Sequence, residues 1–250
     1  MYSVKELSKL QKRSFRNKEG VFLIEGKKIV EEALSSKQAI VQIIFTETFD
    51  RNERIYLSQL SISNIPLSII SDSNAERLTS SKTPAGIFAV VRKNDPQLES
   101  LFDKKMIVVF EDIKDPGNLG TMIRTADWFG ADAVMTTVNG ADPYNDKVLR
   151  STMGSIFHLP LYVSDNLLED LNMLKSKGVK LIVTRPETQT SQPSNQATNQ
   201  LALVIGNESI GTSPEVDQLA DSVMSIPGFG KAESLNASVS FGIIMYELKK

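Results

Sequence analysis

The sequence of 250 residues predicts an α/β protein made of two domains, and three observations support this prediction. Short apolar segments alternate with amphipathic helical segments along most of the chain. The polar stretch 92–100 separates a front part from a back part whose strands are apolar on both faces. The length is sufficient for two domains of ordinary size. We therefore expect one domain over residues 1–96 and a second over residues 97–250.

In the front domain, four apolar segments predict the strands of a small sheet. These segments are residues 21–24, 42–46, 67–70 and 87–91. Between the first two, residues 26–37 place the apolar side chains of Ile29, Val30, Ala33 and Leu34 on one helical face. The order predicts a small αβα module that ends at the polar linker.

In the second domain, the predicted strands are continuous apolar runs with helical segments between them. The runs are residues 106–110, 131–137, 181–184, 202–205 and 223–226. Strands that are apolar on both faces indicate a mostly parallel sheet covered by helices. We expect further helices from about Asn145 and over residues 165–177, and a polar surface loop over residues 187–200.

Two helices of the second domain carry end signals in the sequence. The first is expected to begin at Asn118 as the N-cap and to stop at Gly130, with Arg124 off its apolar stripe. The last helix is expected to be capped by Ser234. Its apolar stripe consists of Leu235, Val239, Ile243 and Tyr246.

Composition excludes several kinds of chemistry. The chain has no cysteine and one histidine, His158, so thiol nucleophiles, disulfides and Cys-rich zinc sites are ruled out. We expect His158 to be structural, and the scattered Asp and Glu residues form no metal-binding cluster. No segment approaches the roughly 20 apolar residues that a membrane span needs. The N-terminal segment lacks the apolar core of a signal peptide, so we expect a cytoplasmic protein.

Charge is unevenly distributed along the chain, although the net charge is only −2. The first 28 residues hold 8 basic against 3 acidic side chains, a cluster that could neutralise several phosphates. Lys12, Arg13 and Arg16 are the predicted RNA contacts within this cluster. A solvated helix face would carry the same charges, so the charge count alone leaves both interpretations open.

Three polar segments follow apolar strands of the second domain, where open α/β sheets bind ligands. In residues 111–131, glycines and Arg124 accompany a helix start, a combination that suits a phosphate. The spacing fits neither a dinucleotide fingerprint nor a Walker loop, which disfavours a nucleotide-dependent enzyme of the Rossmann type. In residues 201–216, Asn207 and Glu208 follow a buried strand. In residues 223–250, a Pro- and Gly-containing loop precedes the last helix.

Together these segments resemble the SpoU (TrmH-type) class of the SPOUT superfamily of RNA methyltransferases. The first family motif, an Asn followed six residues later by an Arg, is matched by Asn118 and Arg124. The second motif is matched by Gly206, Asn207, Glu208 and Gly211. The third is matched by Ile226, Pro227, Gly230, Glu233, Ser234, Leu235, Asn236 and Ser238. Two positions depart from it, because Gly228 replaces the usual Met and Ala237 the usual Val.

The resemblance extends to the front domain, where residues 16–34 are similar to the family's L30e-like RNA-binding domain. It implies a mostly parallel sheet whose C-terminal segment forms a trefoil knot, a path that ordinary topology rules would not suggest. It also implies a homodimer and S-adenosylmethionine bound in the knot. The residues carried over as cofactor contacts are Gly206, Ile226, Leu235 and Thr184.

The implied reaction is methyl transfer to a ribose 2'-hydroxyl, which needs a base or a group that stabilises the developing alkoxide. The resemblance places Arg124 at this centre, surrounded by Asn118, Glu208, Ser234 and Asn236. Because arginine has a pKa above about 12, we expect Arg124 to clamp phosphate and stabilise the oxyanion. It would take the proton itself only if bound RNA perturbed it strongly.

The front domain favours large-subunit (23S) rRNA over tRNA as the substrate, since tRNA enzymes of the family often carry helical extensions at both ends. Neither DNA nor a membrane is an expected partner. An alternative is a non-catalytic RNA- or ribosome-binding factor of the same fold. The retained polar residues favour an enzyme, and Gly228 and Ala237 are smaller than the residues they replace, so they loosen packing and do not block the cofactor.

Overall fold

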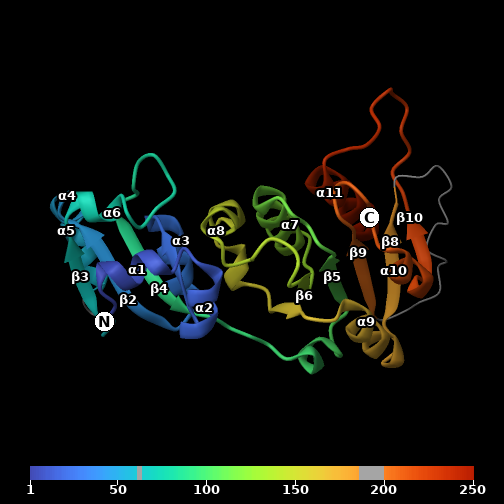
Figure 1. The fold of residues 1–250 in the computed structure, drawn as a ribbon, viewed down its shortest axis with the longest axis horizontal. Helices are drawn as coiled ribbons and strands as arrows, with labels where there is room; N and C mark the ends of the chain where they lie inside the picture. Colours follow the sequence, from blue (N-terminus) through green and yellow to red (C-terminus); the bar gives the residue numbers. More distant parts are fainter. Residues whose placement is uncertain (61–63, 186–199) are drawn as a thin grey trace. The chain divides into compact units, whose positions relative to one another are not determined.

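The computed structural model describes residues 1–60, 64–185 and 200–250 and divides the chain into two compact units (Figure 1). The first unit consists of Met1–Lys93 with Tyr144–Phe157, and the second of Asn94–Pro143 with His158–Lys250. Within the described residues, no helix has the length and hydropathy needed to cross a membrane. The polar loop predicted over residues 187–200 lies outside the described residues except for Gln200.

The sheet of the first unit has four strands, and all four predicted strands are confirmed. They are β1 (Val21–Glu25), β2 (Ile40–Thr46), β3 (Leu67–Ile70) and β4 (Ile87–Arg92), in the order β1-β4-β2-β3. Strand β4 runs antiparallel to β1 and β2, whereas β2 and β3 are parallel. Strands β1 and β3 therefore form the two edges of this sheet.

Short helices surround this sheet. They are α1 (Val4–Lys9), α2 (Arg13–Glu19), α3 (Lys27–Ser35), α4 (Glu47–Asn52), α5 (Arg54–Leu60) and α6 (Asp72–Ala75). Helix α3 confirms the predicted amphipathic segment, because Ile29, Val30 and Ala33 are buried. Helix α1 begins with a capping box between Ser3 and Glu6, which satisfies two backbone N–H groups at once.

A segment from the later half of the chain completes the first unit. It contains α8 (Asp146–Thr152), which begins where a helix was predicted and has Asn145 as its N-cap, and the 3₁₀ turn η3 (Ser155–Phe157). Helix α8 packs against β1, and the ring of Phe22 lies 4.7 Å from Tyr144 and 6.4 Å from Phe157. The sequence alone places this segment in the second domain, whereas its packing contacts place it in the first unit.

The second unit contains a six-stranded sheet in the order β10-β8-β9-β5-β6-β7, and every strand pair in it is parallel. The strands are β5 (Met106–Phe110), β6 (Ala133–Thr137), β7 (Leu161–Ser164), β8 (Lys180–Thr184), β9 (Leu201–Ile205) and β10 (Ser222–Met224). The prediction of a mostly parallel sheet is confirmed. Strand β7 was not predicted, because its four residues are only partly buried in the middle and lack a continuous apolar run.

Helices of the second unit include η2 (Leu98–Leu101), α7 (Pro116–Trp128), α9 (Leu167–Ser176), α10 (Pro214–Leu219) and α11 (Ala237–Lys249). Helix α7 begins three residues earlier than predicted. Its N-cap is Asp115 and not Asn118, and the Asp115 carboxylate accepts a hydrogen bond from the Asn118 backbone N–H. Pro116 then occupies the first helical position, where the missing N–H costs nothing.

Helix α11 also differs from its prediction at both the cap and the stripe. Its N-cap is Asn236 and not Ser234, since the Asn236 side chain accepts from the backbone N–H groups of Ser238 and Val239. The helix packs on α7, and its buried residues are Phe241, Ile244 and Met245. The predicted stripe instead faces outward. Its members Leu235, Val239, Ile243 and Tyr246 are between 39% and 56% exposed.

Candidate active site

The candidate site lies where the strand order of the second sheet reverses. Strands β5, β6 and β7 follow one another outward, whereas β9 returns to the other side of β5. The paired residues Phe110 and Ile205 end β5 and β9 at the same level. The loops after them therefore leave from one edge of the sheet, at the topological switch point where α/β folds bind ligands.

Glu208 connects these two loops. Its carboxylate accepts hydrogen bonds from the backbone N–H of Lys114 (3.2 Å) and of Asp115 (3.3 Å). It also accepts from Asn118 Nδ2 at 3.1 Å. Glu208 of the second motif thereby fixes the start of α7, the helix that carries the first motif.

Asn236 adds the third motif to this cluster. Its Nδ2 donates to Asn118 Oδ1 at 3.0 Å, while its own Oδ1 caps α11. Asn118 is thus held on both sides, with its amide nitrogen toward Glu208 and its oxygen toward Asn236. These contacts span 90 and 118 residues of sequence, so three of the five predicted catalytic residues meet only in the folded chain.

The environment of Glu208 favours its ionised form. Partial burial raises the pKa of this carboxyl, but the hydrogen bonds from Asn118 and from the backbone of Lys114 and Asp115 outweigh burial and lower the pKa below its usual value. Because its oxygens already accept three donors, Glu208 is built to fix Asn118 and the helix start.

Asp112 supports this arrangement and was not predicted from the sequence. It adopts a left-handed backbone conformation with φ of 53°, which is uncommon outside glycine but tolerated by Asp. Thr137 Oγ1 accepts from its backbone N–H at 3.0 Å and donates to its carboxylate at 2.5 Å. Asn207 Nδ2 donates to its carbonyl at 2.8 Å. The polar pair Glu111 and Asp112 directly after β5 is the only signal in the sequence that could have identified this position.

Gly206 is required by the close approach of two backbone segments. A Cβ atom at this position would lie 2.1 Å from the Gly211 carbonyl carbon and 2.1 Å from the Thr212 nitrogen. Asn207 and Gly211 also exchange backbone hydrogen bonds of 2.9 Å, which close the loop into a tight turn. Any side chain at residue 206 would open this turn.

The predicted cofactor residues follow three neighbouring strands. Thr184 ends β8, Gly206 follows β9, and Ile226 lies two residues after β10. Thr184 pairs with Met224 in the parallel register, so these residues leave the sheet at one edge. Leu235 lies just before α11 and is 48% exposed. The Gly206 turn offers backbone groups, Ile226 is half-buried and Leu235 is exposed, and the role of these residues as cofactor contacts stays a prediction.

Arg124 and Ser234 stay outside the hydrogen-bonded cluster. Arg124 lies one and a half turns after Asn118 on α7 and is exposed, with no ion pair to another described residue. Ser234 is exposed on the loop before α11. The guanidinium of Arg124 is therefore free to meet a substrate, and the role of both residues stays a prediction.

The three predicted RNA contacts of the first unit differ in exposure. Lys12 is exposed, and Arg13 is partly so. Arg16 is only 3% exposed, and its guanidinium donates to the Leu10 carbonyl at 2.6 Å. Arg16 is thus a structural residue, and the proposal that it contacts RNA directly is withdrawn.

His158 pairs with a residue outside the cluster. Its Nδ1 is 2.7 Å from Asp127 Oδ2, a surface pair next to the end of α7. Among the described residues, no group of three His, Asp or Glu side chains could hold a metal ion.

Two family models match the chain, one in each half. The SpoU rRNA Methylase family model matches residues 105–246. The MRM3-like substrate binding domain model matches residues 2–89. The motif resemblance and the expected substrate-binding front domain are both confirmed by these matches.

Relatives and solved structures agree with the family models. The 23S rRNA (guanosine(2553)-2'-O)-methyltransferase RlmP of Bacillus subtilis is 35% identical over 98% of this chain and 95% of its own length. The AdoMet-bound rRNA methyltransferase of Sinorhizobium meliloti superposes with a TM-score of 0.83 at 25% identity, over 98% of this chain and 92% of that one. The SpoU methyltransferase AviRb of Streptomyces viridochromogenes, at 24% identity, has the same fold with a TM-score of 0.84 over 98% and 96% of the two chains. The chain therefore belongs to the SpoU rRNA methylase family.

Proposed function

We propose that the protein is an S-adenosylmethionine-dependent methyltransferase that modifies a ribose 2'-hydroxyl of 23S rRNA. The observation that carries this proposal is the cluster in which Glu208 and Asn236 fix Asn118 from opposite sides. Family membership supports the enzyme class and the cofactor. A non-catalytic factor would have no need for a polar cluster assembled from all three motifs.

Methyl transfer creates negative charge on the ribose oxygen, and the site contains a cation that can stabilise it. S-adenosylmethionine, when bound, supplies an electrophilic methyl group on a sulfonium centre. The ribose oxygen loses its proton as it bonds to the methyl carbon, so negative charge develops on that oxygen. Arg124 is permanently cationic and has no ion pair among the described residues, so it can stabilise this charge or clamp the neighbouring phosphate.

Asn118 serves as the positioning residue of this scheme. One of its two amide hydrogens goes to Glu208, and its oxygen accepts from Asn236. The second amide hydrogen remains available for a substrate oxygen. Because the amide is already oriented, no reorganisation is needed when RNA binds.

The choice of substrate is supported by the front half of the chain. RlmP, which matches nearly the whole chain, is named for a guanosine of 23S rRNA. The substrate-binding domain match covers residues 2–89, the part that carries the basic N-terminal cluster. RNA is required because DNA lacks the 2'-hydroxyl. The proposal includes the cytoplasmic location and the C-terminal knot expected from the sequence.

A homodimer through α7 and α11 is part of the proposal. The two helices pack together, and α11 leaves Val239 and Tyr246 more than half exposed. Trp128 at the end of α7 is 83% exposed. A second copy would cover this apolar face. Sedimentation velocity should give a dimer for the natural protein and a monomer for Ile243→Glu, and a monomeric natural protein would refute this part.

The deciding experiment combines cofactor binding with a map of the modification. We expect calorimetric titration to show binding of S-adenosylmethionine to the purified protein. Mass mapping of rRNA from cells with and without the gene should show one lost 2'-O-methyl mark. Reintroducing Arg124→Ala should not restore the mark, although this variant should still bind the cofactor.

Two other results would change the proposal. Cofactor binding with an unchanged rRNA map, but a lost tRNA mark, would assign tRNA as the substrate. Absence of both cofactor binding and a lost mark would leave the non-catalytic RNA-binding factor as the function of the chain.

A further inference from the structure

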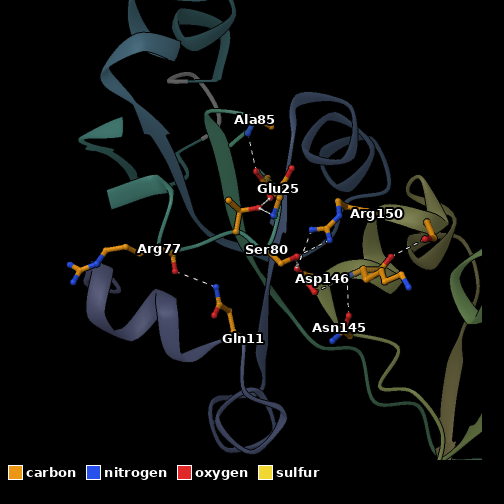
Figure 2. A network of polar contacts seen from close by, with 12 residues as sticks. Gln11, Glu25, Arg77, Ser80, Ala85, Asn145, Asp146 and Arg150 are labelled. Carbon is orange, nitrogen blue, oxygen red and sulfur yellow. Dashed lines mark hydrogen bonds and ion pairs between the residues drawn. The ribbon is translucent and has the colours of Figure 1, made fainter. Parts of the chain in front are cut away.

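The β1 edge of the first unit carries a polar network that joins three segments distant in sequence (Figure 2). These segments are the junction of α1 and α2, the loop 77–86, and the start of α8. The last of them comes from the half of the chain that matches the methylase family model. The network therefore brings residues from both halves to one surface.

Glu25, at the end of β1, accepts hydrogen bonds from two residues of the loop 77–86. One carboxylate oxygen accepts from Thr79 Oγ1 at 2.5 Å, and the other accepts from the Ala85 backbone N–H at 2.8 Å. Both ends of the segment 79–85 are thus attached to the same side chain. The exposed residue Lys82 lies in the middle of this segment.

Helix α8 holds the same loop from the other side. Ser80 donates to the Asp146 carboxylate, and Arg150 donates to Ser80 Oγ at 2.9 Å and to Asp146 at 3.1 Å. Burial raises the pKa of Asp146, but the Ser80 hydrogen bond and the Arg150 charge outweigh it, so the carboxylate stays ionised. Lys147, next to Asp146, is exposed.

The α1–α2 junction is attached through Gln11. Its Nε2 donates to the Arg77 carbonyl at 3.2 Å, while the Arg77 side chain points away from the network (Figure 2). Lys12 follows Gln11 and is exposed. Five exposed cations are therefore within two residues of the network; Lys9 lies over the Phe15 ring, and we name the other four the β1-edge cations. They are Lys12, Arg77, Lys82 and Lys147.

The acidic groups of the network are engaged within it. Asp146 is paired with Arg150, and Glu25 accepts two hydrogen bonds. Glu76 is the exposed acid beside Arg77. The cavity between the three segments has a volume of only about 30 Å³, enough for water but not for a nucleobase. The surface is suited to a line of phosphates and not to an inserted base.

We propose that the β1-edge cations form one surface that binds the phosphate backbone of RNA, with α8 and the loop 77–86 held in place by the Ser80–Asp146–Arg150 contacts. This inference rests on the proposed RNA substrate and extends it to residues of the second half of the chain. It also replaces buried Arg16 with exposed cations. Each phosphate neutralised by such a cation releases counterions, so affinity should fall steeply with salt.

The test is the salt dependence of binding to a labelled 23S rRNA transcript, measured by filter binding across a series of KCl concentrations. The variant Arg77→Ala/Lys82→Ala should lower the slope of log K against log salt by about 1.5, and Lys147→Ala by about 0.8. Lys147→Ala is the decisive variant for α8. All three side chains are exposed, so we expect unchanged melting temperatures.

A matched control removes the same charge from the opposite edge of the sheet. Arg51 and Arg54 are exposed in α4 and α5, and α4 packs beside β3. The variant Arg51→Ala/Arg54→Ala should change the slope by less than about 0.3. The variant Glu76→Gln, which removes an acid beside Arg77, should strengthen binding.

The outcomes separate this inference from the proposed function. If the natural protein binds and methylates 23S rRNA but the β1-edge variants keep its salt slope, the inference is overturned and the proposed function stands. If the natural protein binds only tRNA, and the β1-edge variants lower that slope while the control does not, the surface stands and the rRNA assignment fails. If control and test variants lower the slope equally, the effect is one of net charge and the inference fails.

Discussion

Each unit contains a network of hydrogen-bonded polar side chains. The two networks differ in the number of exposed cations that lie close to them in the sequence. Asn118, Glu208 and Asn236 in the second unit hydrogen-bond to one another and to the ends of two helices, and the exposed cation Arg124 lies further along α7. In the first unit, the network around Ser80 and Asp146 is surrounded by exposed cations.

This difference separates two tasks. A network that orients one amide, on the helix that also carries Arg124, is suited to a reaction at a single atom. A network that fixes a loop carrying several cations is suited to binding a polyanion over some distance. Changes in the second unit should therefore lower kcat, whereas changes in the first should raise KM for RNA.

The largest effect is expected for Arg124→Ala. Loss of the cation that stabilises the developing oxyanion should reduce kcat by about 10²- to 10³-fold. Cofactor affinity should remain within about twofold, since the side chain makes no ion pair in the described fold whose loss could disturb the cofactor loops. Single-turnover methylation with a calorimetric titration checks this, and Arg124→Lys is the charge-matched control. A tenfold loss of RNA affinity at constant kcat would show that Arg124 acts in RNA binding and not in the methyl-transfer step.

Gly206→Ala should reduce methylation activity by a comparable factor, but through a loss of stability and of cofactor binding. The new methyl group would overlap the backbone of Gly211 and Thr212, which should cost about 3 kcal/mol of unfolding free energy and remove cofactor binding. Gly228→Ala is the matched control, because a Cβ there meets no atom within 4 Å. Urea unfolding and calorimetry measure both. Equal stability of the two variants would show that the 206–211 turn is looser than described.

Glu208→Gln should reduce kcat about tenfold, because one carboxylate oxygen that accepts from the backbone becomes a donor. The folded pKa of Glu208 lies below its usual value near 4.5. The stability it contributes is therefore fully present above about pH 4.5 and is lost as the pH falls through the lowered folded pKa. Urea unfolding should accordingly separate natural protein and variant at pH 6, with the pH-dependent part of the gap closing in acid. A gap independent of pH would contradict the ionised role of Glu208.

The smallest effect is expected for Arg150→Ala. It removes the Arg150 hydrogen bond to Ser80 in the loop 77–86 and the contact within α8 that orients Asp146 toward Ser80, so KM for RNA should rise a few-fold while kcat stays unchanged. Steady-state methylation at several RNA concentrations measures the two constants. A fall in kcat with constant KM would contradict the assignment of the first-unit network to RNA binding and of the second-unit network to catalysis.

The sequence was sufficient to locate most elements of both sheets. Apolar runs predicted nine of the ten strands found in the described residues, because continuous burial leaves a continuous apolar pattern. Strand β7 escaped because its middle residues are only half-buried. Helix starts were less certain, since Asp115 and Asn118, or Ser234 and Asn236, are all good caps and only backbone geometry selects between them.

The site was predictable as a set of residues but not as an arrangement. The motifs named Asn118, Glu208 and Asn236, yet which amide faces which partner depends on contacts across 90 to 118 residues. Asp112 carries no motif signal, and its role follows from its backbone conformation. The direction of the α11 stripe was also undetermined, because an apolar face fits both a core and a subunit interface.

Residues 144–157 pack in the first unit but are translated about 120 residues after β1, and this order matters while the protein is being synthesised. Phe22 is 2% exposed in the folded unit, and two of the rings that contact it, Tyr144 and Phe157, belong to that segment. At 5–20 residues per second, roughly 120 residues take about 6 to 24 s to translate. Throughout that interval the nascent β1 strand keeps an uncovered apolar flank, so the front of the chain exposes apolar surface until residues 144–157 have been made.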